Sequence, residues 1–120
     1  MSGISDHGVV ADEEVLRSLL RSDDDSPFVM VNLMKVRDQD ELDSYSRMVL
    51  PLITKHGGSY VHGGPVGGHV VGESEWDFVA LVRYPSRRAF AEMMLSEEYA
   101  RAVAHRIAGV ERAEAFTTPG

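Results

Sequence analysis

The order of strand-like and helix-like segments predicts an α+β protein: a ferredoxin-like β-α-β-β-α-β domain with an antiparallel sheet, preceded by one extra helix. Two segments, FVMVNLMKV (28–36) and WDFVALVRY (76–84), are short, apolar and rich in β-branched or aromatic residues, as strands are. Each is followed by a segment whose apolar residues recur at helical spacing. A glycine-rich stretch between these two units supplies a further strand.

The predicted N-terminal segment, residues 1–26, contains a short helix over residues 12–22. Asp12 is a suitable N-cap, and apolar residues follow at helical spacing, namely Val15, Leu16, Leu19 and Leu20. Three aspartates and Pro27 end this helix. The ferredoxin-like domain then occupies residues 27–118, so the 120 residues form a single domain with an N-terminal extension.

The first strand and helix of the domain have clear boundaries. Pro27 precedes the strand at 28–36, and Asp38 with Glu41 matches a capping box that begins a helix. One face of this helix is apolar, formed by Leu42, Tyr45, Val49, Leu52 and Ile53. Gly57 and Gly58 end the helix, because glycine readily adopts the positive φ found just beyond a helix.

The second half of the domain begins with a glycine-broken strand over residues 59–72, which pairs as a hairpin with residues 76–84. Ser86 is the predicted N-cap of the next helix, with Phe90, Met93 and Met94 on its apolar face. Ser96 starts a second helical stretch that ends at Gly109. Residues 110–117 form the final strand.

Both faces of the predicted sheet are apolar at the strand centres. Residues 28–36 place Met30 and Met34 on one face, and Val29, Val31 and Leu33 on the other. Two main helices can cover only one of these faces. We therefore expect a second copy of the chain to cover the other face, giving a homodimer that closes a barrel.

The composition excludes several classes of function. A net charge of −7 without a basic stripe disfavours binding to nucleic acid or to an anionic membrane. The lack of cysteine excludes disulfides and thiolate nucleophiles. The first residues lack the pattern of a secretion signal, and no apolar run is long enough for a membrane span, so we expect a cytoplasmic protein. The five histidines form neither H-x-H nor H-E-x-x-H, and we expect neither a functional metal nor a bound cofactor.

Four segments together resemble a known family. They are FVMVNLMKV, HGGSYVHGG, WDFVALVRYPSRRAF and EEYARAVAHR, which lie within residues 27–118. On these motifs the chain resembles the small bacterial proteins of unassigned function in the dimeric α/β-barrel superfamily. The resemblance implies a ferredoxin-like fold and a dimer. The wider superfamily includes cofactor-free oxygenases, haem-degrading enzymes, dehydratases and lactone-handling isomerases, a kinship of fold rather than of chemistry.

Three residues are candidates for catalysis: His62, Asn32 and His105. His62 adjoins two glycines that let a ligand approach the backbone, and its imidazole can move a proton near neutral pH; the alternative is a histidine hydrogen-bonded at the sheet edge. Asn32 lies within an apolar strand, so its amide needs a partner, either a substrate carbonyl or a neighbouring loop. His105 follows the more exposed helix face and is the weakest of the three.

Four more residues are candidates for substrate binding. Arg106 shares a helix face with Tyr99, so it either points inward as an anion clamp or caps carbonyls at the helix end. Tyr45 faces the sheet, in the core or at a pocket, while Trp76 walls a pocket or lies in the dimer interface. Tyr60 is the near neighbour of His62 along the same strand.

The main functional hypothesis is a cofactor-independent enzyme that performs acid–base chemistry, such as isomerisation, cyclisation or dehydration. Its substrate is a small apolar carbonyl or hydroxyl compound of the kind found in secondary metabolism. Alternatives are a cofactor-free monooxygenase and a non-catalytic dimer that binds a ligand or a partner. Convergence of His62, Asn32 and Arg106 on one cavity favours the enzyme, whereas a cavity below ~100 Å³ favours the non-catalytic dimer.

Overall fold

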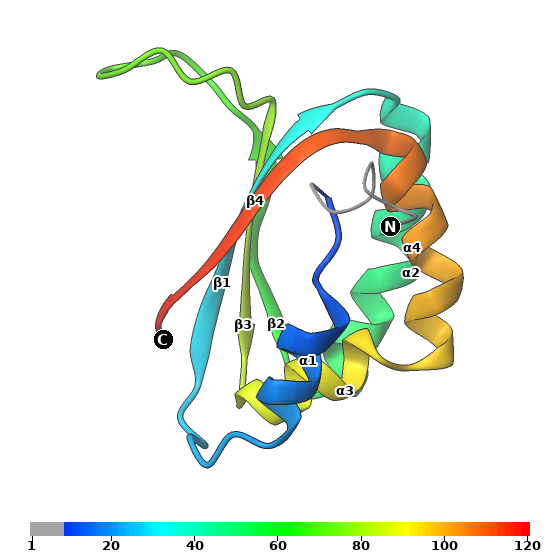
Figure 1. The fold of residues 1–120 in the computed structure, drawn as a ribbon. Helices are drawn as coiled ribbons and strands as arrows, with labels where there is room; N and C mark the ends of the chain where they lie inside the picture. Colours follow the sequence, from blue (N-terminus) through cyan, green and yellow to red (C-terminus); the bar gives the residue numbers. More distant parts are fainter. Residues whose placement is uncertain (1–8) are drawn as a thin grey trace.

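A computed structural model describes residues 9–120 and has the predicted α+β architecture (Figure 1). Four antiparallel strands form one sheet in the order β2-β3-β1-β4, with the helices gathered on one side of it. The elements in chain order are α1 (Glu13–Leu20), β1 (Phe28–Val36), α2 (Gln39–Lys55), β2 (Ser59–Pro65), β3 (Phe78–Tyr84), α3 (Arg87–Met94), α4 (Glu97–Gly109) and β4 (Val110–Pro119). The ferredoxin-like prediction is therefore confirmed; residues 1–8 of the predicted N-terminal segment lie outside the described part.

Capping side chains start the helices where the sequence predicts them. Asp38 Oδ1 accepts the backbone N–H groups of Asp40 and Glu41 at the start of α2. Ser86 Oγ accepts the N–H of Ala89 at 3.1 Å at the start of α3, and Ser96 plays the same part for α4. These oxygens bind N–H groups that a helix cannot bond internally, and each cap stabilises its helix by ~1 kcal/mol.

The hairpin of β2 and β3 is shorter than predicted. β2 ends at Pro65 and β3 begins at Phe78, so residues 66–77 form a loop that extends beyond the sheet (Figure 1). A hydrogen bond of 2.9 Å from the Val66 N–H to the Asp77 carbonyl closes the base of this loop. Proline has no N–H to donate and the glycines that follow weaken pairing, which is why the strand stops here.

The core lies between the helices and the sheet face turned toward them. Phe28, Met93 and Val110 are the largest side chains that are fully buried. Phe28, Tyr84 and Phe90 form an aromatic cluster at one end of the layer, with ring centroids 4.9 to 6.1 Å apart. The inner face of the sheet is therefore held by packing against α2, α3 and α4.

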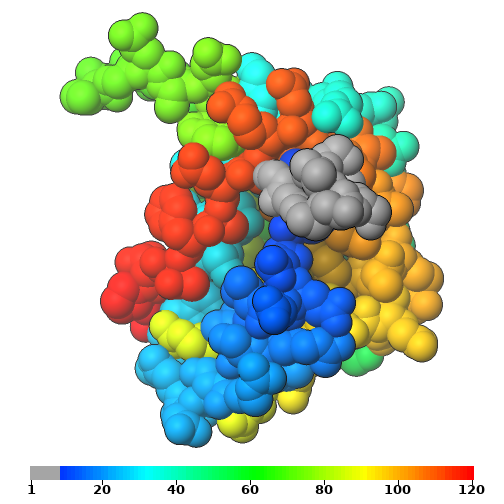
Figure 2. All heavy atoms as spheres, viewed as in Figure 1, coloured from blue at the N-terminus to red at the C-terminus, as the bar shows by residue number. Residues whose placement is uncertain are grey.

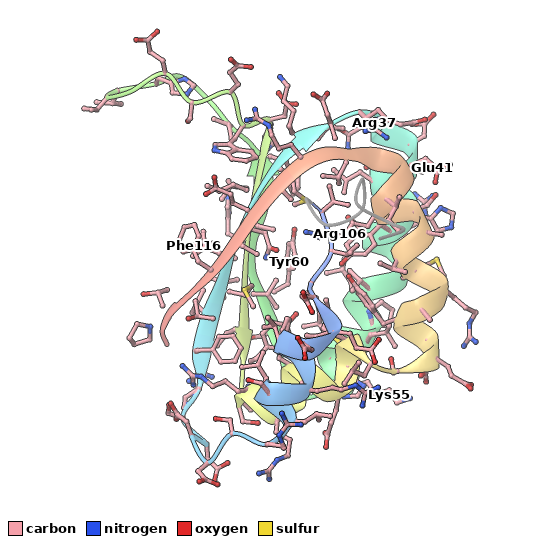
Figure 3. All side chains as sticks on the ribbon, viewed as in Figure 1. Arg37, Glu41, Lys55, Tyr60, Arg106 and Phe116 are labelled. Carbon is pink, nitrogen blue, oxygen red and sulfur yellow. The ribbon has the colours of Figure 1, made fainter. Side chains whose placement is uncertain are left out.

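The outer face of the sheet is apolar and no helix of residues 9–120 covers it (Figures 1 and 3). Val31 on β1 pairs with Leu81 on β3 and with Phe116 on β4, so these three side chains form one row across the sheet. Phe116 is 50% exposed, and Val61 on β2 is 56% exposed. Figure 3 shows Phe116 on the side of β4 away from the helices. The bare apolar face that motivated the dimer prediction is thus present.

Candidate functional site

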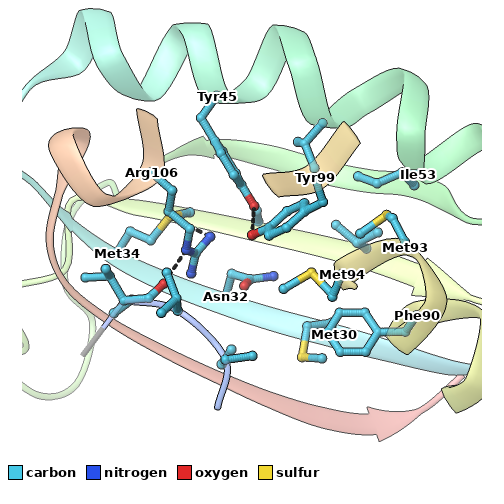
Figure 4. A pocket seen from close by; sticks show the side chains of 18 of the residues that line it. Met30, Asn32, Met34, Tyr45, Ile53, Phe90, Met93, Met94, Tyr99 and Arg106 are labelled. Carbon is cyan, nitrogen blue, oxygen red and sulfur yellow. Dashed lines mark hydrogen bonds between the residues drawn. The ribbon is translucent and has the colours of Figure 1, made fainter. Parts of the chain in front are cut away.

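A cavity of about 470 Å³ lies between the helices and the inner face of the sheet (Figure 4). Its volume is within the ~300–1,000 Å³ that ligand pockets usually have. Apolar side chains make up most of its wall, among them Met30, Phe90, Met93 and Met94. A few polar groups interrupt that wall, and three of the predicted site residues, Asn32, Tyr45 and Arg106, belong to them.

Arg106 is a buried cation on the wall of the cavity. Its side chain comes from the last turn of α4 and the residue is 8% exposed. The guanidinium Nε donates to the backbone carbonyl of Val9, Nη1 approaches the sulfur of Met34 at 4.0 Å, and Cζ lies 5.5 Å from the centroid of the Tyr45 ring. Burial acts to lower the pKa of Arg106, but Tyr45 and Tyr99 outweigh it, so the pKa lies above its usual value and the charge is kept.

Two buried tyrosines on facing helices meet beside Arg106. The hydroxyls of Tyr45 on α2 and Tyr99 on α4 share a hydrogen bond of 2.8 Å. Their rings meet edge to face, with centroids 6.0 Å apart. Burial, followed by the effect of the neighbouring Tyr45, raises the pKa of Tyr99 well above its usual value. Tyr99 is therefore a hydrogen-bond donor and not a base near neutral pH.

Asn32 faces the same space from the middle of β1. Figure 4 shows its amide close to Arg106 and to the hydroxyl pair. Within residues 9–120 the Asn32 side chain has no hydrogen-bond partner. Every fully buried side-chain N or O atom of this region does have one, so the amide of Asn32 is not fully buried. The amide is thus open to the cavity, which makes it available to a ligand.

Tyr60 also lines the cavity, because β2 has a glycine in the right place. A Cβ at Gly63 would lie 1.8 Å from the Tyr60 hydroxyl oxygen, so any side chain at position 63 would collide with the tyrosine. Figure 3 shows Tyr60 turned toward the helices. Burial raises the pKa of Tyr60. The glycine next to His62 therefore makes room for the ring of Tyr60, which lies partly exposed at the cavity wall.

The segment that precedes β1 lies over one side of the cavity. Val9, Val10 and Leu16 line it, and the Val9 carbonyl binds Arg106. In Figure 2 the atoms of this segment, in dark blue, lie between β4 and α4. Arg88 on α3 holds the other end of α1, donating to the carbonyls of Leu20 and Ser22 at 3.3 Å each. The N-terminal helix is therefore part of the cavity wall.

Three of the predicted site residues lie away from this cavity. An irregularity in β2 between Tyr60 and His62 shifts the register, so His62 sits opposite Leu81, whose side chain points from the outer face. His105 Nδ1 is 2.6 Å from Glu41 Oε1, a pair that links α4 to α2 at a partly exposed position. Trp76 lies in the loop before β3, under the guanidinium of Arg112 at 4.9 Å. His62 therefore does not share the cavity with Asn32 and Arg106, because one extra residue turns it to the opposite face, and the convergence that would have favoured the enzyme is not present.

Sequence reasoning missed two contributors to the site. Tyr99 was not among the predicted site residues, although the sequence already placed it on the helix face of Arg106, seven residues or two turns earlier. That spacing could have placed its hydroxyl beside the guanidinium. The Val9 carbonyl carries no sequence signal, because a backbone group is present at every position.

The described part of the chain contains neither a membrane-length apolar helix nor a cluster of three or more His, Asp or Glu side chains suited to a metal ion.

The fold and the cavity define a class of protein: a ferredoxin-like α+β domain with an internal apolar pocket between sheet and helices and a bare outer sheet face. The chain belongs to the family described as a domain of unknown function, DUF1330, whose model matches residues 26–117. The predicted resemblance to small proteins of unassigned function in the dimeric α/β-barrel superfamily is confirmed. Among curated protein sequences, none matches the chain.

Solved structures with the same fold agree with this assignment. RPA0582 from Rhodopseudomonas palustris, a protein of unknown function, is 28% identical over 93% of this chain and 95% of its own, with a TM-score of 0.81. A dimeric ferredoxin-like protein of unknown function from Thermobifida fusca is 14% identical over 78% of this chain and 91% of its own, with a TM-score of 0.59. SnoaB from Streptomyces nogalater, a cofactor-independent oxygenase, is 12% identical over 79% and 93%, with a TM-score of 0.60. The last two similarities concern the fold alone.

Proposed function

We propose that this protein binds a small, mostly apolar molecule in the cavity and stabilises negative charge on one of its oxygen atoms, as an enzyme that needs no cofactor. The observation that carries the proposal is the buried guanidinium of Arg106 on the wall of an apolar cavity of about 470 Å³. Such a cation acts far more strongly than it would in water, because the surroundings are poorly polarisable.

The chemistry follows from which atoms face the ligand. When the oxygen of a substrate carbonyl accepts hydrogen bonds from Arg106 and Tyr99, the carbonyl group withdraws electrons more strongly. A proton on the carbon next to that carbonyl group then becomes more acidic. The enolate that forms is the common first intermediate of isomerisation, cyclisation and dehydration. Asp12, on the cavity wall at the start of α1, is the carboxylate available to accept that proton. Asn32 fixes the orientation of the oxygen.

Proton exchange tests this proposal without knowledge of the natural substrate. The protein is incubated in D₂O with 2-tetralone or 4-phenyl-2-butanone, and loss of the proton next to the carbonyl is followed by NMR. Arg106→Gln and Tyr99→Phe each slow the exchange by about a hundredfold, the usual effect of losing one oxyanion donor. His62→Ala, altered on the outer face, leaves it unchanged. Ketone binding without any accelerated exchange would rule out the enzyme.

A non-catalytic ligand-binding protein is the second candidate, and one observation favours it. Within the described residues no histidine lines the cavity, and Asp12 already accepts the Glu14 N–H at 2.8 Å as the cap of α1. A protein that only holds its ligand needs no base. Consumption of dioxygen with the same ketones would instead favour the cofactor-free oxygenase, the activity that SnoaB is described as having.

We propose further that the protein works as a homodimer joined through the outer face of the sheet. The row formed by Val31, Leu81 and Phe116 is apolar and is left bare by the helices of the described chain. Dimeric ferredoxin-like proteins among the fold relatives, from Thermobifida fusca and Bacteroides fragilis, support this arrangement. In such a dimer His62 lies near the interface and not in the cavity.

A further inference from the structure

We infer that the ligand of the cavity is a carboxylate with an apolar body, bound by the Nη edge of Arg106. This inference rests on the proposed binding of a small, mostly apolar molecule in the cavity and names the charge of that molecule; the neutral ketones of the exchange assay are then carbonyl analogues of the carboxylate. Four features of the cavity carry it: a cation with no carboxylate partner among residues 9–120, a set of hydrogen-bond donors, the position of Asp12, and the backbone contact that orients the arginine.

The first feature is that no carboxylate of the described residues serves as a counterion for Arg106. Within residues 9–120 no carboxylate lies within 4 Å of its guanidinium, whereas Arg17 and Arg87 both pair with acidic residues. A buried charge is costly unless it is paired. Arg106 has five N–H donors, and its partners in this region are the Val9 carbonyl, the Met34 sulfur, which is a weak acceptor, and the Tyr45 hydroxyl, which helps to raise its pKa. Donors are therefore left for a ligand.

The second feature is that the groups around Arg106 also donate. The Tyr45 and Tyr99 hydroxyls share one hydrogen bond, so one of the two O–H groups remains free to donate. The Asn32 amide, open to the cavity, adds two N–H donors. A carboxylate has two oxygens that only accept hydrogen bonds, and it matches this set better than a neutral carbonyl with one oxygen.

The third feature is the charge elsewhere on the wall. Asp12 is the acidic residue among those that line the cavity, and it lies at the start of α1, exposed and already bound to the Glu14 N–H. Apart from Arg106 and Asp12 the lining is uncharged: most of it is thioether, aromatic and aliphatic, with a few amide and hydroxyl groups. Nothing in it repels an anion near the guanidinium, and its apolar area selects a ligand with an apolar body.

The fourth feature is the Val9 carbonyl, which orients the guanidinium. Its hydrogen bond occupies Nε, so a carboxylate bound side by side through both oxygens takes the edge formed by Nη1 and Nη2, where Nη1 has the Met34 sulfur at 4.0 Å as a weak acceptor. The Tyr45 ring lies along the guanidinium and limits its rotation. Because Val9 belongs to the segment before α1, this segment both closes the cavity and fixes the arginine.

Matched probes test the charge separately from the shape. Calorimetry compares 2-naphthoate with 2-naphthamide, and octanoate with octanamide, because each pair shares one apolar body. We expect the carboxylate of at least one pair to bind roughly tenfold to a hundredfold more tightly than its amide, as a hydrogen-bonded ion pair requires. The preference should change little with salt, since the pair is buried. NMR resonances of the Asn32 amide and of Arg106 Nε report where the probe binds.

Variants then assign the preference to one residue. Arg106→Gln should bring carboxylate binding down to the level of the amide and leave amide binding within about twofold. Arg101→Gln, which changes an exposed arginine on the same helix, should alter neither. A preference that survives Arg106→Gln overturns the inference.

The wild-type protein alone also decides the question, should Arg106→Gln fail to fold. Equal binding of carboxylate and amide, with the Asn32 amide shifted by both, overturns the carboxylate inference and leaves the proposed binding function standing. Binding of neither member of either pair overturns both.

Discussion

Phe116→Glu is the substitution that most directly tests whether a second copy covers the sheet. Phe116 lies on the edge strand β4, is 50% exposed and pairs with Val31 at the centre of the sheet. Its ring lies on the outer side of β4, although the residue also borders the cavity, so the fold of the variant is checked alongside its mass. Glutamate in its place puts a charge in the middle of the proposed interface, once from each protomer.

The size of the effect follows from the exposed area of that ring. A phenylalanine buries ~150–250 Å² when fully covered, so the half that is exposed here amounts to roughly 100 Å². At ~25 cal/mol per Å² this gives about 2.5 kcal/mol per protomer and about 5 kcal/mol per symmetric dimer. Area converts only partly into affinity, and we therefore expect the dissociation constant to rise by at least about a hundredfold.

Sedimentation velocity over a range of micromolar concentrations measures this change. The wild-type chain should sediment at twice its 13.2 kDa mass and Phe116→Glu at the mass of one chain, with the circular dichroism spectrum kept. Ala104→Glu adds the same charge on the exposed surface of α4 and should remain dimeric. A well-folded wild-type protein that sediments as a single chain, or a Phe116→Glu variant as dimeric as the wild type, would refute the reasoning.

Three further predictions concern the packing beneath the cavity. In urea titrations, Tyr45→Phe and Tyr99→Phe should each lower the free energy of unfolding by ~1–3 kcal/mol. The double variant should lower it by about 1 kcal/mol less than the sum of the two single effects. Strict additivity would mean that the 2.8 Å contact between the hydroxyls contributes nothing. Gly109→Ala puts a Cβ 2.7 Å from the backbone nitrogen of Leu42 and should lower the free energy of unfolding by ~1–3 kcal/mol. Gly67→Ala is the control, because its Cβ would have no atom within 4 Å, and it should leave that free energy unchanged. Equal midpoints of thermal unfolding for the two variants would contradict this prediction. The folded protein keeps a proton on Tyr99 that the unfolded chain loses near pH 10, because the pKa of Tyr99 is raised in the folded state. The free energy of unfolding should therefore fall as the pH rises above 10, and it should fall less steeply in Tyr99→Phe. Parallel pH profiles for the two proteins would count against the raised pKa.

Much of the fold could be predicted because its signals are local. Asp38, Ser86 and Ser96 cap their helices as expected, since a cap depends on a few neighbouring residues. The strand FVMVNLMKV was recognised by its composition, and its alternation correctly separated the two faces of the sheet. The end of β2 was set too late, because how far a strand continues depends on what its partner can pair with.

The candidate site was harder, and His62 shows why. Strict alternation along β2 cannot anticipate an extra residue between Tyr60 and His62, yet that residue turns Tyr60 toward the cavity and His62 away from it. Asn32 and Arg106 were identified as polar residues in apolar surroundings, a pattern that survives small errors of register. Their approach to one another depends on how α4 packs over β1, which no local pattern specifies.

The amino-acid order by itself determined the succession of helices and strands and the two apolar faces of the sheet, because periodicity and capping act over a few residues. Only the tertiary structure decided which polar groups share the cavity. Tyr45 and the Val9 carbonyl reach Tyr99 and Arg106 of α4 from two other parts of the chain, across sequence separations of 54 and 97 residues in the two hydrogen bonds concerned. Contacts over such distances follow from the packing of whole elements, and the environment that makes one arginine chemically unusual exists only once those elements have come together.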